Sequence, residues 1–210
     1  MTFRALALLL AIGVAGSVAR AEVIDRILAV VARELITLSD VTAAIRLGLV
    51  GQPGGQDAIR AGLDTLIARQ LELSEANRYQ PPEPAPAQVD GRLAAVRARF
   101  ATPAAFTETL AQSGLSEEQL RLRLRDDLRI EAYLAQRFGT NRQPSDSELV
   151  DYYRTHESEF TGPAGVRPFA DVREEVRTRV AAVQRATQMA DWLEGLRRRT
   201  EVTDLYVVAK

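Results

Sequence analysis

The hydrophobic and polar positions of the chain predict short β-strands near its two ends and helices between them. Residues 23–31 (VIDRILAVV) and 35–38 (LITL) are rich in β-branched and aliphatic side chains, which is typical of strands. Residues 202–208 (VTDLYVV) have the same character. A two-stranded hairpin alone is marginally stable in water, so we expect the strand 202–208 to pair with the N-terminal strands in one small sheet.

The connection between the first two strands lacks the usual turn residues. Residues 32–34 (Ala-Arg-Glu) contain no Gly or Asn, which most readily adopt positive φ. A tight type I′ hairpin is still expected there, although these residues favour it less than Gly or Asn would.

Apolar residues recur at three- and four-residue steps between the strands, which predicts amphipathic helices. Local signals mark several starts: Ser39 as an N-cap, Thr102 with Pro103 at the first helical position, and capping boxes at 116–119 and 145–148. The expected helices cover about 40–50, 56–79, 86–100, 103–112, 116–138, 145–156 and 169–199. The fold class is thus mostly α with a small β-sheet.

Two of these helices carry apolar patterns that predict their packing. The last helix has apolar residues close to heptad spacing, and we expect this stripe to pack along other helices over its whole length. Its members are Val172, Val176, Val180, Val183, Ala186, Ala190, Leu193 and Leu196. In helix 116–138, Leu122 and Tyr133 fall opposite the main stripe, which suggests partners on two faces.

The N-terminus has the form of a cleavable signal peptide. Arg4 precedes an apolar run, Ala5 to Val14, and Ala19-Arg20-Ala21 satisfies the small-x-small rule for cleavage before Glu22. The alternative is a membrane anchor, but the run is short for a span, which needs about 20 residues. We therefore expect residues 1–21 to be removed and the protein to be exported. Residues 22–210 should then form one module, in which 22–160 and the C-terminal helix and strand, 168–210, pack together.

Composition and charge exclude several classes of function. The 210 residues include no cysteine, and the net charge is −1, falling to −3 without residues 1–21, so neither disulfides nor nucleic-acid binding are expected. Hydrophobic residues make up 46%, enough for a folded core. The prolines of 81–86 (PPEPAP) can be a polyproline ligand or a stiff connector between helices, and the connector is the simpler interpretation.

No catalytic constellation is visible in the sequence. His156 is the only histidine, and without cysteine or a set of carboxylate partners it makes no metal site. Phosphate-binding glycine loops and the motifs GxSxG and HExxH are absent. We expect no cofactor and no metal. His156 is then interpreted as a solvated residue at a helix C-terminus.

The order of segments resembles that of the SurA-type chaperones of the parvulin class. VIDRILAVVARELITLSDV (23–41) is similar to the opening strand, turn and helix of that family, and PFADVREEVRTRV (168–180) with WLEGLRRRTEV (192–202) is similar to its closing helix and strand. The resemblance covers nearly all of residues 22–210. It implies a SurA N-domain-like helical chaperone fold with paired terminal strands.

One departure from the family pattern changes the expected activity. One or two parvulin prolyl-isomerase domains follow the segment like YYRTHESEF (152–160) in the family, whereas seven residues separate Phe160 from Pro168 here. A domain needs at least about 50 residues. The resemblance thus implies a chaperone that lacks the parvulin domain and is not an enzyme.

The resemblance implies a periplasmic holdase that works without ATP on unfolded polypeptides, such as outer-membrane β-barrel proteins. Tyr79, Phe100, Phe106 and Tyr133 are the aromatic candidates for client binding, and the alternative is that they are ordinary core residues. Two other functions remain open. One is a prolyl isomerase with residual or partner-dependent activity, and the other is a dedicated assembly factor with a single partner.

Overall fold

The computed structural model describes residues 25–51, 57–139, 143–163 and 165–207. The predicted signal peptide and its cleavage site between Ala21 and Glu22 lie outside these residues. No helix within the described ranges is long and apolar enough to cross a membrane.

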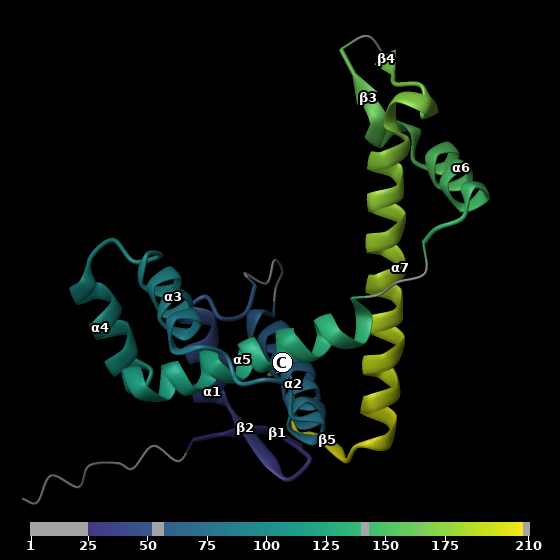
Figure 1. Cartoon of the computed structure of the whole chain (residues 1–210). Helices are drawn as coiled ribbons and strands as arrows, with labels where there is room; N and C mark the ends of the chain where they lie inside the picture. Colours follow the sequence, from purple (N-terminus) through teal and green to yellow (C-terminus); the bar gives the residue numbers. More distant parts are fainter. Residues whose placement is uncertain (1–24, 52–56, 140–142, 164, 208–210) are drawn as a thin grey trace, which may run out of the picture.

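Helices dominate the fold, with strands near both ends of the described chain (Figure 1). In chain order the elements are β1 (Ile27–Val31), β2 (Glu34–Thr37), α1 (Leu38–Arg46), α2 (Ala58–Tyr79), α3 (Pro86–Arg97), α4 (Pro103–Gln112), α5 (Glu117–Phe138), α6 (Asp146–Thr155), the 3₁₀ helix η1 (Glu157–Phe160), β3 (Thr161–Gly162), β4 (Gly165–Val166), α7 (Phe169–Arg199) and β5 (Val202–Asp204). The predicted class, mostly α with a small sheet, is confirmed.

The terminal strands pair as the sequence predicts. The sheet has the order β2-β1-β5, and β1 is antiparallel to both neighbours. A bulge between Ile27 and Ala29 adds one residue to β1, so the adjacent Leu28 and Ala29 both lie in the core. Side chains reinforce the pairing, because Arg60 of α2 holds Asp204 of β5 at 2.6 Å.

The β1–β2 turn is tight despite its sequence. Ala32 and Arg33 alone connect the strands, and their φ angles are 51° and 74°. Both central residues of a type I′ turn require positive φ. The pairing of β1 with β2 and β5 therefore holds two residues in a conformation that neither favours.

Capping explains most helix starts. The boxes at Ser116 and Ser145 and the Thr102 cap before Pro103 form as predicted. The first helix differs, because its N-cap is Thr37 rather than Ser39. Thr37 and Asp40 form a reciprocal capping box, in which the Thr37 amide donates to the Asp40 carboxylate at 2.9 Å.

The helical body has its main core between the sheet, α1, α2 and the C-terminal end of α7. A neighbouring core joins α3, α4 and the start of α5. The third lies far along α7, where Leu149 of α6, Phe160 of η1 and three valines of α7 pack together: Val172, Val176 and Val180. We call this last group, residues 146–180, the small lobe.

Helix α7 contradicts the prediction that its stripe packs over its whole length. Its C-terminal end is buried in the body at Leu196, and its first turns are buried in the small lobe. Between them Val183 is 51% exposed, and Ala186 and Ala190 are exposed as well. Figure 1 shows the reason, since α7 carries the small lobe away from the body. Whether 22–160 and 168–210 behave as one module stays a prediction.

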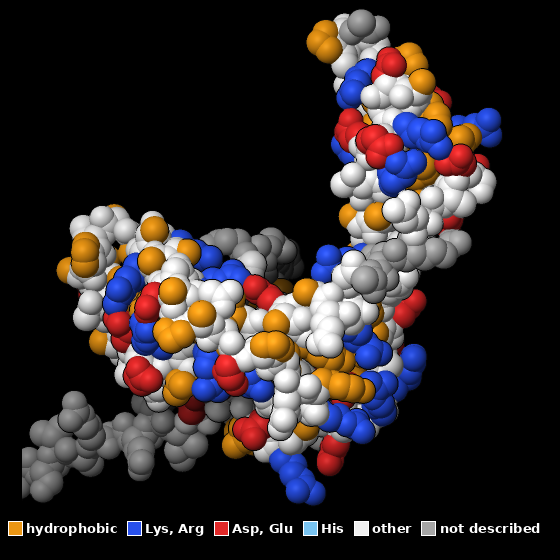
Figure 2. All heavy atoms as spheres, in the orientation of Figure 1, with side chains coloured by type: hydrophobic (Ala, Val, Ile, Leu, Met, Phe, Trp, Pro, Cys, Tyr) orange, Lys and Arg blue, Asp and Glu red, His pale blue; other side chains and the backbone are white. Residues whose placement is uncertain are grey.

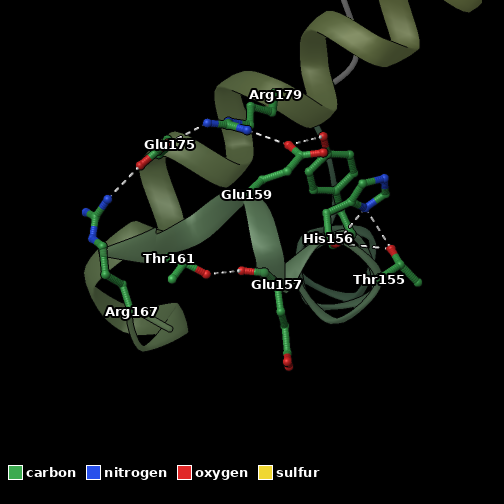
Figure 3. A network of polar contacts seen from close by, with 9 residues as sticks. Thr155, His156, Glu157, Glu159, Thr161, Arg167, Glu175 and Arg179 are labelled. Atoms are coloured by element: carbon green, nitrogen blue, oxygen red, sulfur yellow. Dashed lines mark hydrogen bonds and ion pairs between the residues drawn. The ribbon is translucent and has the colours of Figure 1, made fainter. Parts of the chain in front are cut away.

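Ion pairs organise the surface of the small lobe (Figure 3). Arg179 of α7 pairs with both Glu159 of η1 and Glu175 of α7, and Arg167 reaches Glu175 at 3.1 Å. His156 stacks on Tyr152 with ring centroids 4.0 Å apart. The Arg179–Glu159 pair links η1 to α7, and the Arg167–Glu175 pair links the segment after β4 to α7.

The positive φ angles in the β1–β2 turn lead to a prediction about stability. Arg33→Gly should raise the free energy of unfolding by about 1 kcal/mol, because a left-handed conformation costs a non-glycine residue about that much. The matched control is Ala94→Gly at an exposed interior position of α3, which should lower it by roughly 0.5–1 kcal/mol. Urea unfolding checks both, and a loss of stability in Arg33→Gly equal to that of the control would contradict the turn geometry.

Candidate functional site

The four aromatic candidates lie as two pairs in different places. Phe100 and Phe106 meet edge to face beside α4, with centroids 5.6 Å apart, and line a hollow of about 520 Å³. Tyr79 and Tyr133 stack at 5.4 Å where α2 and α5 end. Burial differs within each pair: Phe106 and Tyr133 are buried at 3% and 4%, whereas Phe100 is half-buried and Tyr79 is 59% exposed.

The pair at the ends of α2 and α5 belongs to a larger aromatic group. Trp192 of α7 lies 6.0 Å from Tyr133 and 5.5 Å from Phe138 between ring centroids. The guanidinium of Arg137 sits 5.5 Å from the centroids of Phe138 and Trp192, within cation–π range. We call these five residues, Tyr79, Tyr133, Arg137, Phe138 and Trp192, the aromatic junction.

The position of Tyr133 corrects one sequence expectation. Tyr133 and Leu122 were both expected on a second contact face of α5, but Leu122 is 46% exposed and only Tyr133 is buried. The reason is that Tyr133 lies near the end of α5 where Trp192 of α7 covers it.

Two polar atoms of the aromatic junction are buried without a hydrogen-bond partner among the described residues. They are the hydroxyl of Tyr133 and the indole Nε1 of Trp192. Burial raises the pKa of Tyr133 above its usual value, so its hydroxyl stays protonated. Polar groups without partners cost free energy in a folded protein, and here both lie at the meeting point of α5 and α7.

An apolar hollow adjoins the aromatic junction along α7. It measures about 490 Å³ and is lined by Phe138 and Gly139 of α5 and by Ala181, Ala182, Arg185, Ala186 and Met189 of α7. In Figure 2 hydrophobic side chains gather on the visible face between the body and the lower half of α7, with basic side chains beside them. The segment 181–190 carries one charged residue, Arg185, and that scarcity is the signal by which the sequence could have revealed this surface.

The hollow is lined mainly by small apolar side chains of α7, which can contact apolar segments of another chain. No group of three or more His, Asp and Glu that could hold a metal occurs in the described parts of the chain. His156 lies in the small lobe, where its Nδ1 is 2.8 Å from the Thr155 hydroxyl.

The absence of a partner for the Tyr133 hydroxyl can be tested with a pair of variants. Tyr133→Phe should leave the free energy of unfolding unchanged or raise it by up to about 1 kcal/mol, because removing this hydroxyl breaks no hydrogen bond. Tyr206→Phe is the control: its hydroxyl donates to Asp57 at 2.9 Å, and its loss should cost about 1 kcal/mol. Thermal unfolding compares them, and equal destabilisation would show that Tyr133 has a polar partner.

Comparison with known proteins found similar sequences and a similar fold. No protein-family model matches the chain. Chaperone SurA of Bordetella pertussis and Chaperone SurA of Bordetella bronchiseptica are each 30% identical to it over 146 residues, a span of 65% of this chain. The match covers 28% of each relative, so the chain corresponds to only part of their length.

The fold has a counterpart among solved structures. It comes from the structures of the virulence factor PEB4 and the periplasmic protein Cj1289, two SurA-like chaperones of Campylobacter jejuni. The match has a TM-score of 0.55 at 15% identity, and covers 87% of this chain and 100% of that chain. In sequence the chain is therefore similar to part of Chaperone SurA, and its fold is similar to that of a SurA-like chaperone.

Proposed function

We propose that the chain is a chaperone that holds unfolded polypeptides without ATP, and that clients bind where α5 meets the middle of α7. The observation that carries this proposal is a set of exposed apolar side chains on the middle of α7: Ala182, Val183, Ala186 and Ala190. The kinship with SurA-type chaperones supports the activity. The surface offers small apolar side chains on α7 beside the buried ring of Phe138 on α5.

The proposed clients are outer-membrane β-barrel proteins in the periplasm. Their strands alternate apolar and polar residues and would aggregate in water before insertion. Export through cleavage before Glu22 is part of the same proposal, and it rests on the N-terminal sequence.

Release without an energy source requires weak binding. Micromolar affinity corresponds to about −8 kcal/mol, which a modest apolar contact can supply. The open arrangement suits this requirement, because a client can leave the face of α7 without any opening of a core.

A charge placed in the hollow tests the proposed surface. Ala186→Glu should reduce suppression of β-barrel aggregation several-fold, because an apolar client segment would then have to desolvate a carboxylate. The melting temperature should hardly change, since Ala186 is exposed.

Gln188→Glu provides the matched control for that variant. Gln188 is exposed on the same turn of α7 but does not line the hollow, so holding should be unaffected. Equal loss in both variants would indicate a general charge effect, and no loss in either would exclude this surface.

Prolyl isomerisation is the alternative function, and we propose that the chain lacks it. Between Phe160 and Pro168 the described residues form the short β3–β4 hairpin, and His156 is stacked on Tyr152. In a short-peptide assay the protein should show turnover no higher than the uncatalysed background. Turnover above background that His156→Ala abolishes would instead establish an isomerase.

A further inference from the structure

A second cavity lies within the helical body, away from the aromatic junction. It measures about 410 Å³, within the size range of small-ligand sites, and lies half open to solvent between α2, α3, α5 and the segment after α1. Apolar side chains supply much of its wall: Leu49, Val50, Leu66, Val96, Leu124, Ile130 and Leu134. The lining also includes four arginines and three acids: Arg69, Arg92, Arg99, Arg123, Glu72, Asp127 and Glu131.

Three of the four arginines have partners. Arg69 donates from Nε to Asp127 at 2.5 Å, and Arg92 binds Glu131 at the same distance. Arg99 donates to the backbone carbonyls of Leu47 and Gly48. These contacts satisfy the guanidinium groups and hold the cavity wall together.

Arg123 is different. Its guanidinium makes no hydrogen bond or ion pair with any residue that the structure describes, and its Nε is buried. The backbone carbonyl of Arg123 accepts a hydrogen bond from Arg69, which fixes that turn of α5 beside a second positive charge. Burial, and then the nearby charge of Arg69, lower the pKa of Arg123, while the carboxylates of Asp127 and Asp40 act in the opposite direction.

An unpaired, half-buried charge costs stability, and such costs are characteristic of binding sites that await a ligand. The guanidinium of arginine presents two parallel donors that match a carboxylate. Glu72 also lines the cavity, and burial raises the pKa of its carboxyl group. Apolar walls around this donor favour a carboxylate that carries an apolar group.

We infer that this cavity binds the C-terminal carboxylate of a polypeptide whose last side chain is apolar, with Arg123 as the carboxylate receptor. The inference deepens the proposed chaperone function, on which it rests, by assigning a site for one end of the client. A chain terminus carries the carboxylate that Arg123 can bind, whereas the middle of a chain offers no backbone charge. The guanidinium supplies the charge complement.

The test measures binding of an N-terminally labelled hexapeptide that ends in leucine and phenylalanine. Fluorescence anisotropy should show at least tenfold tighter binding with a free C-terminal carboxylate than with a C-terminal amide. Arg123→Gln should abolish that difference. Arg125→Gln is the matched control, because Arg125 lies on the same helix, pairs with Asp126 at 3.0 Å and does not line the cavity. It should preserve the difference.

Stability and competition measurements complete the test. Arg123→Gln should leave the melting temperature unchanged or raise it, whereas a fall would identify Arg123 as a structural residue and overturn the inference. Equal affinity for acid and amide peptides would also overturn it. Decanoate serves as the fatty-acid probe: if it binds at Arg123 while the acid peptide does not, the polypeptide assignment is wrong.

The proposed chaperone function can be tested separately from the carboxylate site. Arg123→Gln should still suppress aggregation of a long unfolded client through the hollow on α7. If the protein still suppresses aggregation but binds the acid and amide peptides equally, only the inference of a carboxylate site is wrong. Loss of suppression in the unmodified protein would remove the proposed function itself.

Discussion

The antiparallel pairing of β5 with β1 is the constraint on which the rest of the architecture depends. It fixes the C-terminal end of α7 against the body, where Leu196 joins the main core and Arg60 holds Asp204. A helix of 31 residues anchored at one end must extend well past the body, since each residue adds about 1.5 Å. The small lobe then covers the other end of α7, and the middle stays exposed.

This arrangement explains how a small protein keeps an apolar surface in water and stays folded. The cores at the two ends of α7 bury the valines and leucines that stability needs, including Val176 and Leu196. The segment between them is made of small side chains such as Ala182 and Ala186, which expose little apolar area each. Exposing these side chains therefore costs the folded protein little stability.

The sequence predicted which helices and strands form better than it predicted which of their faces are buried. Helix starts followed from capping residues such as Ser116 and Ser145, and the pairing of the terminal strands followed from their need for partners. Periodicity shows which residues share a helix face but not whether another element covers that face, so the exposure of Val183 could not be foreseen. The turn at Ala32 and Arg33 shows the opposite effect, because the sheet imposes a conformation that local sequence disfavours. The unpaired state of Arg123 depends on its three-dimensional neighbours and leaves no sequence signal.

The most direct test of the proposed binding surface is site-specific photo-crosslinking of the chain to unfolded β-barrel proteins. A photoreactive residue at Ala182, which lines the hollow between α5 and α7, should give abundant adducts with unfolded β-barrel proteins in the periplasm. The same residue at Arg154, exposed on α6 in the small lobe, should give few. Equal yields at the two positions, or adducts from Arg154 alone, would contradict the claim that clients are held at the middle of α7.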